Sequence, residues 1–112
     1  MEIEPIARRI RALNDAARAN LTGGTMCFIT CGIKALPAAD QAFIVDRVRT
    51  FADFNDDNDP WGEHDFGSFD HNGNTIFWKI DCSDREMKHR SPNPADAAVT
   101  QRVLTVLLAE EY

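Results

Sequence analysis

The chain has 112 residues and a formal net charge of −6, a length that is typical of one domain. Its 44% hydrophobic and 27% charged residues exclude a disordered chain, and no apolar run approaches the ~20 residues that span a bilayer. Three cysteines without a C-x-x-C spacing argue against a disulfide framework. We expect a single domain over residues 1–112 in the cytoplasm, because the acidic residues 1–4 do not begin a secretory signal.

The first half of the chain predicts a helix, a strand and a second helix. Apolar residues recur at helical spacing over residues 5–21, and the helix should end by Gly23. Residues 25–33 are rich in β-branched and sulfur side chains and predict a strand. A second apolar stripe follows Pro37, so residues 37–51 predict another helix.

An Asn-Gly pair marks the clearest local signal, a two-residue hairpin turn at Asn72 and Gly73. The register pairs His71 with Asn74, Phe69 with Ile76, Gly67 with Trp78, Asp65 with Ile80 and His64 with Asp81. The missing side chain of Gly67 would make room for the indole of Trp78, so Trp78 should face the core. The same register makes Asp65 lean inward.

The end of the chain predicts a third helix. Asn93 and Pro94 are typical of an N-cap followed by a proline at the first helical position, and an apolar face runs from Val99 to Leu108. The fold class is therefore α+β: three helices packed on a small, mainly antiparallel sheet made of one strand and the Asn-Gly hairpin. The wide apolar face of the last helix would suit a homodimer.

Charge is distributed unevenly along the chain. Residues 50–78 contain seven acidic residues and no Lys or Arg, whereas the other 11 acids and 12 basic residues nearly cancel. The seven are Asp53, Asp56, Asp57, Asp59, Glu63, Asp65 and Asp70. The first helix carries Arg8, Arg9, Arg11 and Arg18, so the molecule should be electrically two-sided. This balance disfavours direct nucleic-acid binding, which depends on Lys and Arg, and favours a basic protein partner.

The run Glu63-His64-Asp65 places an imidazole between two carboxylates and could supply a general base. In a strand, however, His64 would point away from both acids, and a histidine paired with Asp81 but without a nucleophile is more typical of a structural hydrogen bond. We therefore predict no catalytic residue, and keep a small hydrolase or metal-assisted enzyme built on this run as an alternative.

Two patterns resemble metal sites and fail on spacing. The alternating oxygens of residues 53–59 are typical of a calcium loop, but Asn58 replaces the sixth-position glycine and His64 the twelfth-position acid. Cys27 and Cys31 would lie roughly 13 Å apart on one strand face, too far to join Cys82 around one zinc ion. We expect no metal and no cofactor, and we interpret the cysteines as small core residues.

Several motifs are more specific than any of these patterns. They are Asn14-Asp15, Thr22-Gly23-Gly24, Phe51-x-x-Phe54, the block Asn58-Asp59-Pro60-Trp61-Gly62-Glu63-His64-Asp65-Phe66-Gly67, Phe77-Trp78-Lys79-Ile80-Asp81, Ser91-Pro92-x-Pro94-Ala95-Asp96, Arg102-Val103-Leu104-Thr105 and the closing Glu111-Tyr112. From about Ile10 to its end, the chain resembles domain-of-unknown-function family 3768. The resemblance implies a small acidic protein carried by bacterial mobile genetic elements, near antirestriction-type genes.

These observations predict an anti-defence inhibitor, an anti-CRISPR protein that binds a CRISPR or restriction complex. Its carboxylates would replace DNA phosphates in a basic groove, with fast and salt-sensitive association. The predicted partner-binding residues are Asp53, Asp56, Asp57, Asp59, Trp61, Glu63, His64, Asp65 and Asp70. Trp61 would either anchor the interface or close its loop against the core. Besides the enzyme, a dimerising accessory module without direct activity is a further alternative.

Overall fold

The helices predicted in the first half of the chain are present. The computed structural model describes residues 5–21 and 23–112, so residues 1–4, with their two glutamates, and Thr22 of the family motif lie outside the described residues. Helix α1 spans Pro5–Ala19, a short helix α2 spans Cys31–Lys34, and α3 spans Ala38–Thr50 with Pro37 at its N-cap. In the described part of the chain, no helix is long and apolar enough to cross a membrane.

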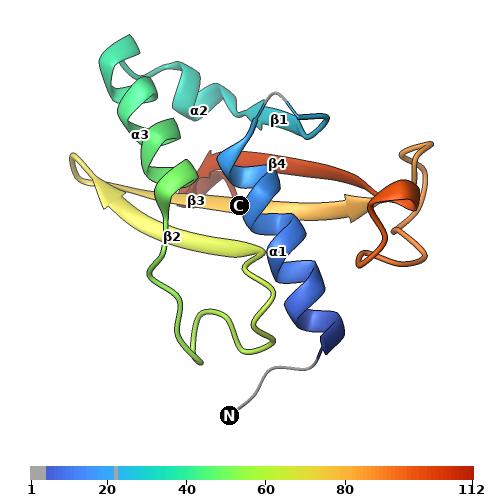
Figure 1. Cartoon of the computed structure of the whole chain (residues 1–112). Helices are drawn as coiled ribbons and strands as arrows, with labels where there is room; N and C mark the ends of the chain where they lie inside the picture. The colour runs from blue at the N-terminus through green and yellow to red at the C-terminus, as the bar shows by residue number, and fades with distance from the viewer. Residues whose placement is uncertain (1–4, 22) are drawn as a thin grey trace.

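The strands form one four-stranded mixed sheet in the order β1-β4-β3-β2. They span Met26–Ile29 (β1), Phe66–His71 (β2), Asn74–Ser83 (β3) and Gln101–Leu108 (β4), with short 3-10 turns at Ala97–Val99 (η1) and Ala109–Glu111 (η2). Strand β4 pairs parallel with β1 and antiparallel with β3. Figure 1 shows β4 in red, between β1 and β3. The chain is a small α+β domain, but the prediction of a mainly antiparallel sheet was wrong.

The third predicted helix was also wrong, because its residues form β4. Both faces of this strand are buried along most of its length, so its sequence is a nearly continuous apolar run that lacks strand alternation. The residues that predicted an N-cap stabilise turns instead. Asn93 Oδ1 accepts a hydrogen bond from Ala95 N, and Asp96 Oδ1 accepts one from Ala98 N, which caps η1. The predicted homodimer face therefore does not exist as a helix face.

The hairpin prediction is confirmed. Asn72 and Gly73 have φ values of 48° and 81°, as a type I′ turn requires, and Gly67 pairs with Trp78. A Cβ at Gly67 would lie 2.6 Å from Cε2 of Trp78, whose side chain is fully buried. This close approach explains why residue 67 is a glycine, since any larger side chain would clash with the indole. The predicted register ends at Asp65, whose carbonyl accepts from Ile80 N.

The strand predicted over residues 25–33 ends early, at Ile29. The chain then turns into α2, where Glu111 accepts hydrogen bonds from Thr30 Oγ1 and Gly32 N. Cys31 consequently lies exposed on α2 and does not share a strand face with Cys27.

The core lies between one face of the sheet and the helices. It contains Ile33 of α2, Ile44 and Val48 of α3, Phe51, and inward residues of β2, β3 and β4. Helix α1 packs on α3 and on β4, and Figure 1 shows it lying across the sheet. All three helices therefore cover the same face, and residues 51–65 connect α3 to β2 beside α1.

Candidate functional site

Helix α1 holds the segment that carries most of the acidic residues. Arg11 Nε donates to the Gly62 carbonyl at 2.7 Å, and Asn14 Nδ2 donates to the Glu63 carbonyl at 3.0 Å. Arg102 of β4 donates in turn to Asn14 Oδ1 at 2.7 Å, which fixes the orientation of the amide. Residues 51–65 contain no helix or strand, so these side-chain bonds position them.

Arg18 has a structural role that the sequence analysis missed. Its side chain is buried, and its guanidinium donates to the Val48 and Phe51 carbonyls at 2.8 and 2.7 Å, at the end of α3. The guanidinium also lies 4.6 Å from the ring centroid of Trp78. Burial lowers the pKa of Arg18, and the neighbouring Asp15 offsets this only in part. The prediction that Arg18 belongs to a solvent-facing basic surface was wrong.

His64 joins the same segment to α1. Its Nδ1 lies 2.8 Å from Asp15 Oδ1, its Nε2 lies 3.5 Å from Asp59 Oδ2, and its ring stacks on Phe54 with centroids 3.7 Å apart. The backbone at His64 is left-handed, with φ of 56°. That conformation turns the side chain away from β3, so the predicted pairing with Asp81 was wrong.

The seven acidic residues do not form one surface. Asp59 is only 8% exposed, and its carboxylate accepts from His64 N at 3.1 Å, so it stabilises the loop from within. Asp70 lies on β2, where it accepts from Thr75 Oγ1. The structure therefore separates Asp59 and Asp70 from the other predicted partner-binding carboxylates.

The loop after α3 presents three carboxylates and an indole to solvent. Asp53, Asp56 and Asp57 are exposed, and Trp61 is 78% exposed, so Trp61 does not close the loop against the core. Asn55 Oδ1 accepts from the backbone of residues 57 and 58, which fixes the shape of the loop. Among the described residues, no hydrogen bond or ion pair engages the carboxylates of Asp53, Asp56 and Asp57. We call residues 53–61 the acidic loop.

A cavity of about 610 Å³ opens beside the acidic loop. The side chains of Ile6, Phe54 and Trp61 give it apolar walls, and Arg11 and Asp56 lie at its polar side. This cavity could accept a partner side chain that combines an apolar stem with a positive end.

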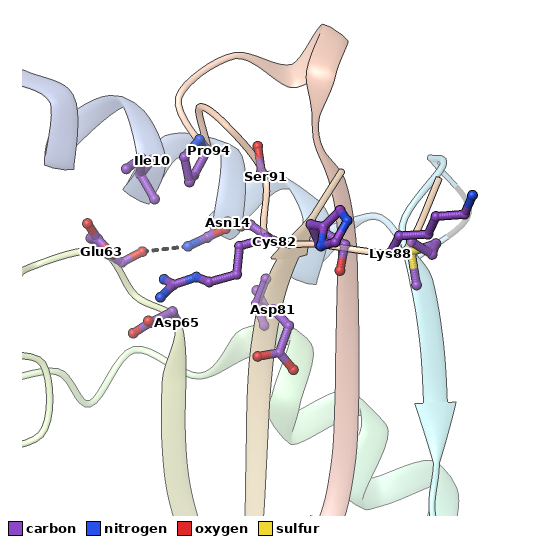
Figure 2. A pocket seen from close by; sticks show the side chains of 14 residues that line it. Ile10, Asn14, Glu63, Asp65, Asp81, Cys82, Lys88, Ser91 and Pro94 are labelled. Atoms are coloured by element: carbon purple, nitrogen blue, oxygen red, sulfur yellow. Dashed lines mark hydrogen bonds between the residues drawn. The ribbon is translucent and has the colours of Figure 1, made fainter. Parts of the chain in front are cut away.

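A second cavity of about 550 Å³ lies on the other side of Glu63, and Figure 2 shows Glu63 and Asp65 on one side of it, with Asp81 and Cys82 on the neighbouring strand β3. Burial raises the pKa of Glu63, and the charges of Asp65 and Asp59 raise it further while Arg90 opposes them. Partial burial also raises the pKa of Asp65 and that of the Cys82 thiol, but Asp65 is an exposed residue, so the prediction that it leans inward was wrong. The acidic run is thus divided between two cavities.

The sequence predicted the acidic loop but missed the groups that hold it. Asn14 and Arg18 lie on the buried side of α1 together with Ile10 and Ala17. Polar residues at those helical positions were the available signal for a buried network. Within the part of the chain that the structure describes, no three His, Cys, Asp or Glu side chains converge as a metal site.

The comparisons with known proteins give one match. The family model described as "Protein of unknown function (DUF3768)" matches residues 29–111. No curated protein and no solved structure matches the sequence. The matched range covers most of the chain. It includes the acidic loop, every strand except the first residues of β1, and Glu63, which lines both cavities. The chain belongs to the DUF3768 family.

Proposed function

We propose that this protein is a stoichiometric binding protein that inhibits a nucleic-acid-handling defence complex, as an anti-CRISPR protein does, in the cytoplasm. The acidic loop enters a basic groove of that complex and takes the place of DNA phosphates. One observation carries the proposal: the acidic loop exposes the indole of Trp61 together with the carboxylates of Asp53, Asp56 and Asp57, which have no partner among the described residues.

This combination suits a partner rich in arginine and lysine. Carboxylates that make no ion pair within their own chain keep their full attraction for an incoming cation. An exposed tryptophan adds a large apolar contact, and its ring face attracts a guanidinium. Because Asn55 fixes the loop before binding, little conformational entropy is lost on association.

The site gives binding more support than catalysis. Both ring nitrogens of His64 face carboxylates of its own chain, those of Asp15 and Asp59, at 2.8 and 3.5 Å. Asp65 lines the other cavity, whereas His64 lines the cavity beside the acidic loop, so the run Glu63-His64-Asp65 does not converge as one catalytic group.

An interference assay tests the proposal. Cells whose CRISPR system or restriction enzyme attacks a plasmid would express the chain, and plasmid survival would be measured against the amount of chain present. We expect survival to rise until the chain equals its target in number, as one-to-one binding requires. Inactivation of a large excess of target by a small amount of chain would indicate an enzyme instead.

Matched variants locate the activity. The triple variant Asp56→Asn, Asp57→Asn, Trp61→Ala should lose protection and keep its thermal midpoint, because all three side chains are exposed. The control Asp46→Asn with Glu110→Gln removes two exposed charges elsewhere and should protect fully. Equal protection by both variants would contradict the proposal.

A further inference from the structure

One face of the sheet is not covered by any helix in the described part of the chain. The inward residues of β2, β3 and β4 pack against the helices, and the alternate residues face the opposite side. On that open face Phe28 lies beside Thr105, Thr105 beside Lys79, and Phe77 beside Leu107. We call this surface the open face.

The open face combines aromatic side chains with exposed polar side chains of β2 and β3. Phe66 contacts Phe77, and Phe77 contacts Tyr112, with ring centroids 5.1 and 5.8 Å apart. Phe28 remains 50% exposed and Tyr112 79% exposed, while Leu107 is buried beneath its neighbours. Exposed aromatic side chains on a face that no helix covers are typical of an interaction site.

The charges on this surface favour a second copy of the same chain. Lys79 and Asp81 lie near its centre and pair at 3.3 Å, and Asp70 lies at its hairpin end. Two copies of a chain with net charge −6 repel each other, and a face whose central charges cancel brings them together at the lowest electrostatic cost. A two-fold axis near Thr105 would also let Lys79 of one copy approach Asp81 of the other, as a self-complementary surface requires.

The size of the open face is close to what such a contact needs. The four strands have four, six, ten and eight residues, which at a spacing of about 4.8 Å and a rise of ~3.3 Å per residue gives roughly 440 Å² of flat area per copy. Side chains that project from the sheet make its accessible area larger than its flat area, so two copies would approach the ~1,000 Å² that a specific interface reaches. Sheets commonly pack face to face in this way.

We propose that the protein forms a two-fold homodimer in which the open faces of two sheets pack together. Gly62 and Glu63, which directly follow the acidic loop, are bonded to α1 on the helical side of the sheet, so both copies keep their loops accessible. The dimer does not depend on the proposed function, and a partner groove would meet two acidic loops.

Sedimentation equilibrium of the purified full-length chain tests the dimer. We expect a mass of twice 12.6 kDa for the wild type, falling to 12.6 kDa for Phe28→Asp with Tyr112→Asp. Both side chains are exposed, so the circular dichroism spectrum of the folded variant should not change. The control Trp61→Asp removes an equally exposed aromatic from the acidic loop and should stay dimeric.

Two results would overturn the dimer. One is a wild-type mass of 12.6 kDa at every micromolar concentration tested. The other is a dimer that persists in the Phe28 and Tyr112 variant, which would place the contact elsewhere, for example at the free edge of β1. A second variant, Lys79→Asp with Asp81→Lys, preserves the charge pair and should remain dimeric, whereas Lys79→Asp alone should weaken the dimer. Loss of plasmid protection with the dimer intact would count against the proposed function only.

Discussion

Replacing Arg18 by methionine should destabilise the fold strongly, although the residue is charged and lies on a helix. The change keeps an apolar stem under Trp78 but removes the donors that now bond the Val48 and Phe51 carbonyls at 2.8 and 2.7 Å. The Val48 carbonyl then keeps only the long bond from Phe51 N at 3.4 Å, and the Phe51 carbonyl loses its side-chain donor. An unsatisfied buried carbonyl costs about 1–3 kcal/mol, and the lost contact of the cation with the indole adds up to about 1 kcal/mol. Methionine carries no charge, so the variant avoids the cost of burying the guanidinium, and this offsets part of the loss. We expect a net destabilisation of about 3 kcal/mol.

Urea unfolding measures this loss. With a dependence of about 1.5 kcal/mol per molar urea for a chain of this size, the midpoint should fall by about 2 M. The matched control is Arg49→Met, since Arg49 is exposed and donates to the Ala19 carbonyl at 3.2 Å across the same pair of helices. A surface bond of this kind contributes about 0.5 kcal/mol or less. Equal losses for the two variants would refute the assignment of Arg18 as a buried anchor.

Three further predictions concern the hairpin, the second cavity and the loop. Gly67→Ala should cost about 1–3 kcal/mol because its Cβ would lie 2.6 Å from Cε2 of Trp78, whereas Ser68→Ala, on the open face, should change the thermal midpoint little. Glu63→Gln should raise the urea midpoint at pH 7. Folding raises the pKa of the Glu63 carboxyl, so the folded protein becomes less stable as pH rises through that pKa and the carboxyl ionises, whereas glutamine stays neutral. The advantage should vanish below about pH 4, where the carboxyl is protonated in both states, and a gain that persists there would show a packing effect instead. In His64→Asn, asparagine tolerates the left-handed backbone at φ 56°, but the bond to Asp15 and the stack on Phe54 are lost. Urea unfolding should therefore show a decrease of about 1–3 kcal/mol in the free energy of unfolding. An unchanged midpoint would mean that the His64 contacts do not hold the loop.

Local signals predicted the hairpin and the two long helices. The Asn72-Gly73 pair fixes its own turn geometry, so the position of Gly67 opposite Trp78 follows by counting. Helix α3 likewise begins directly after Pro37. These features depend on residues close together in the chain.

The features that were missed depend on distant residues. Strand β4 is apolar on both faces because it lies between β1 and β3, and the apolar run alone is equally compatible with a buried helix. The partners of His64 come from α1 and from Asp59, and a left-handed backbone is difficult to predict for a histidine. The charge anomaly was visible in the sequence, but which carboxylates are exposed depended on the loop geometry.

The most direct test of the central claim is a competition experiment on the captured partner. The immobilised wild-type chain would be loaded with host lysate at low salt, washed, and challenged with duplex DNA. The account predicts that DNA releases a nucleic-acid-binding defence subunit, and that the Asp56→Asn, Asp57→Asn, Trp61→Ala variant retains none of it. Release of the same subunit from wild type and variant alike, or retention of no DNA-displaceable protein, would contradict the claim that the acidic loop replaces nucleic acid.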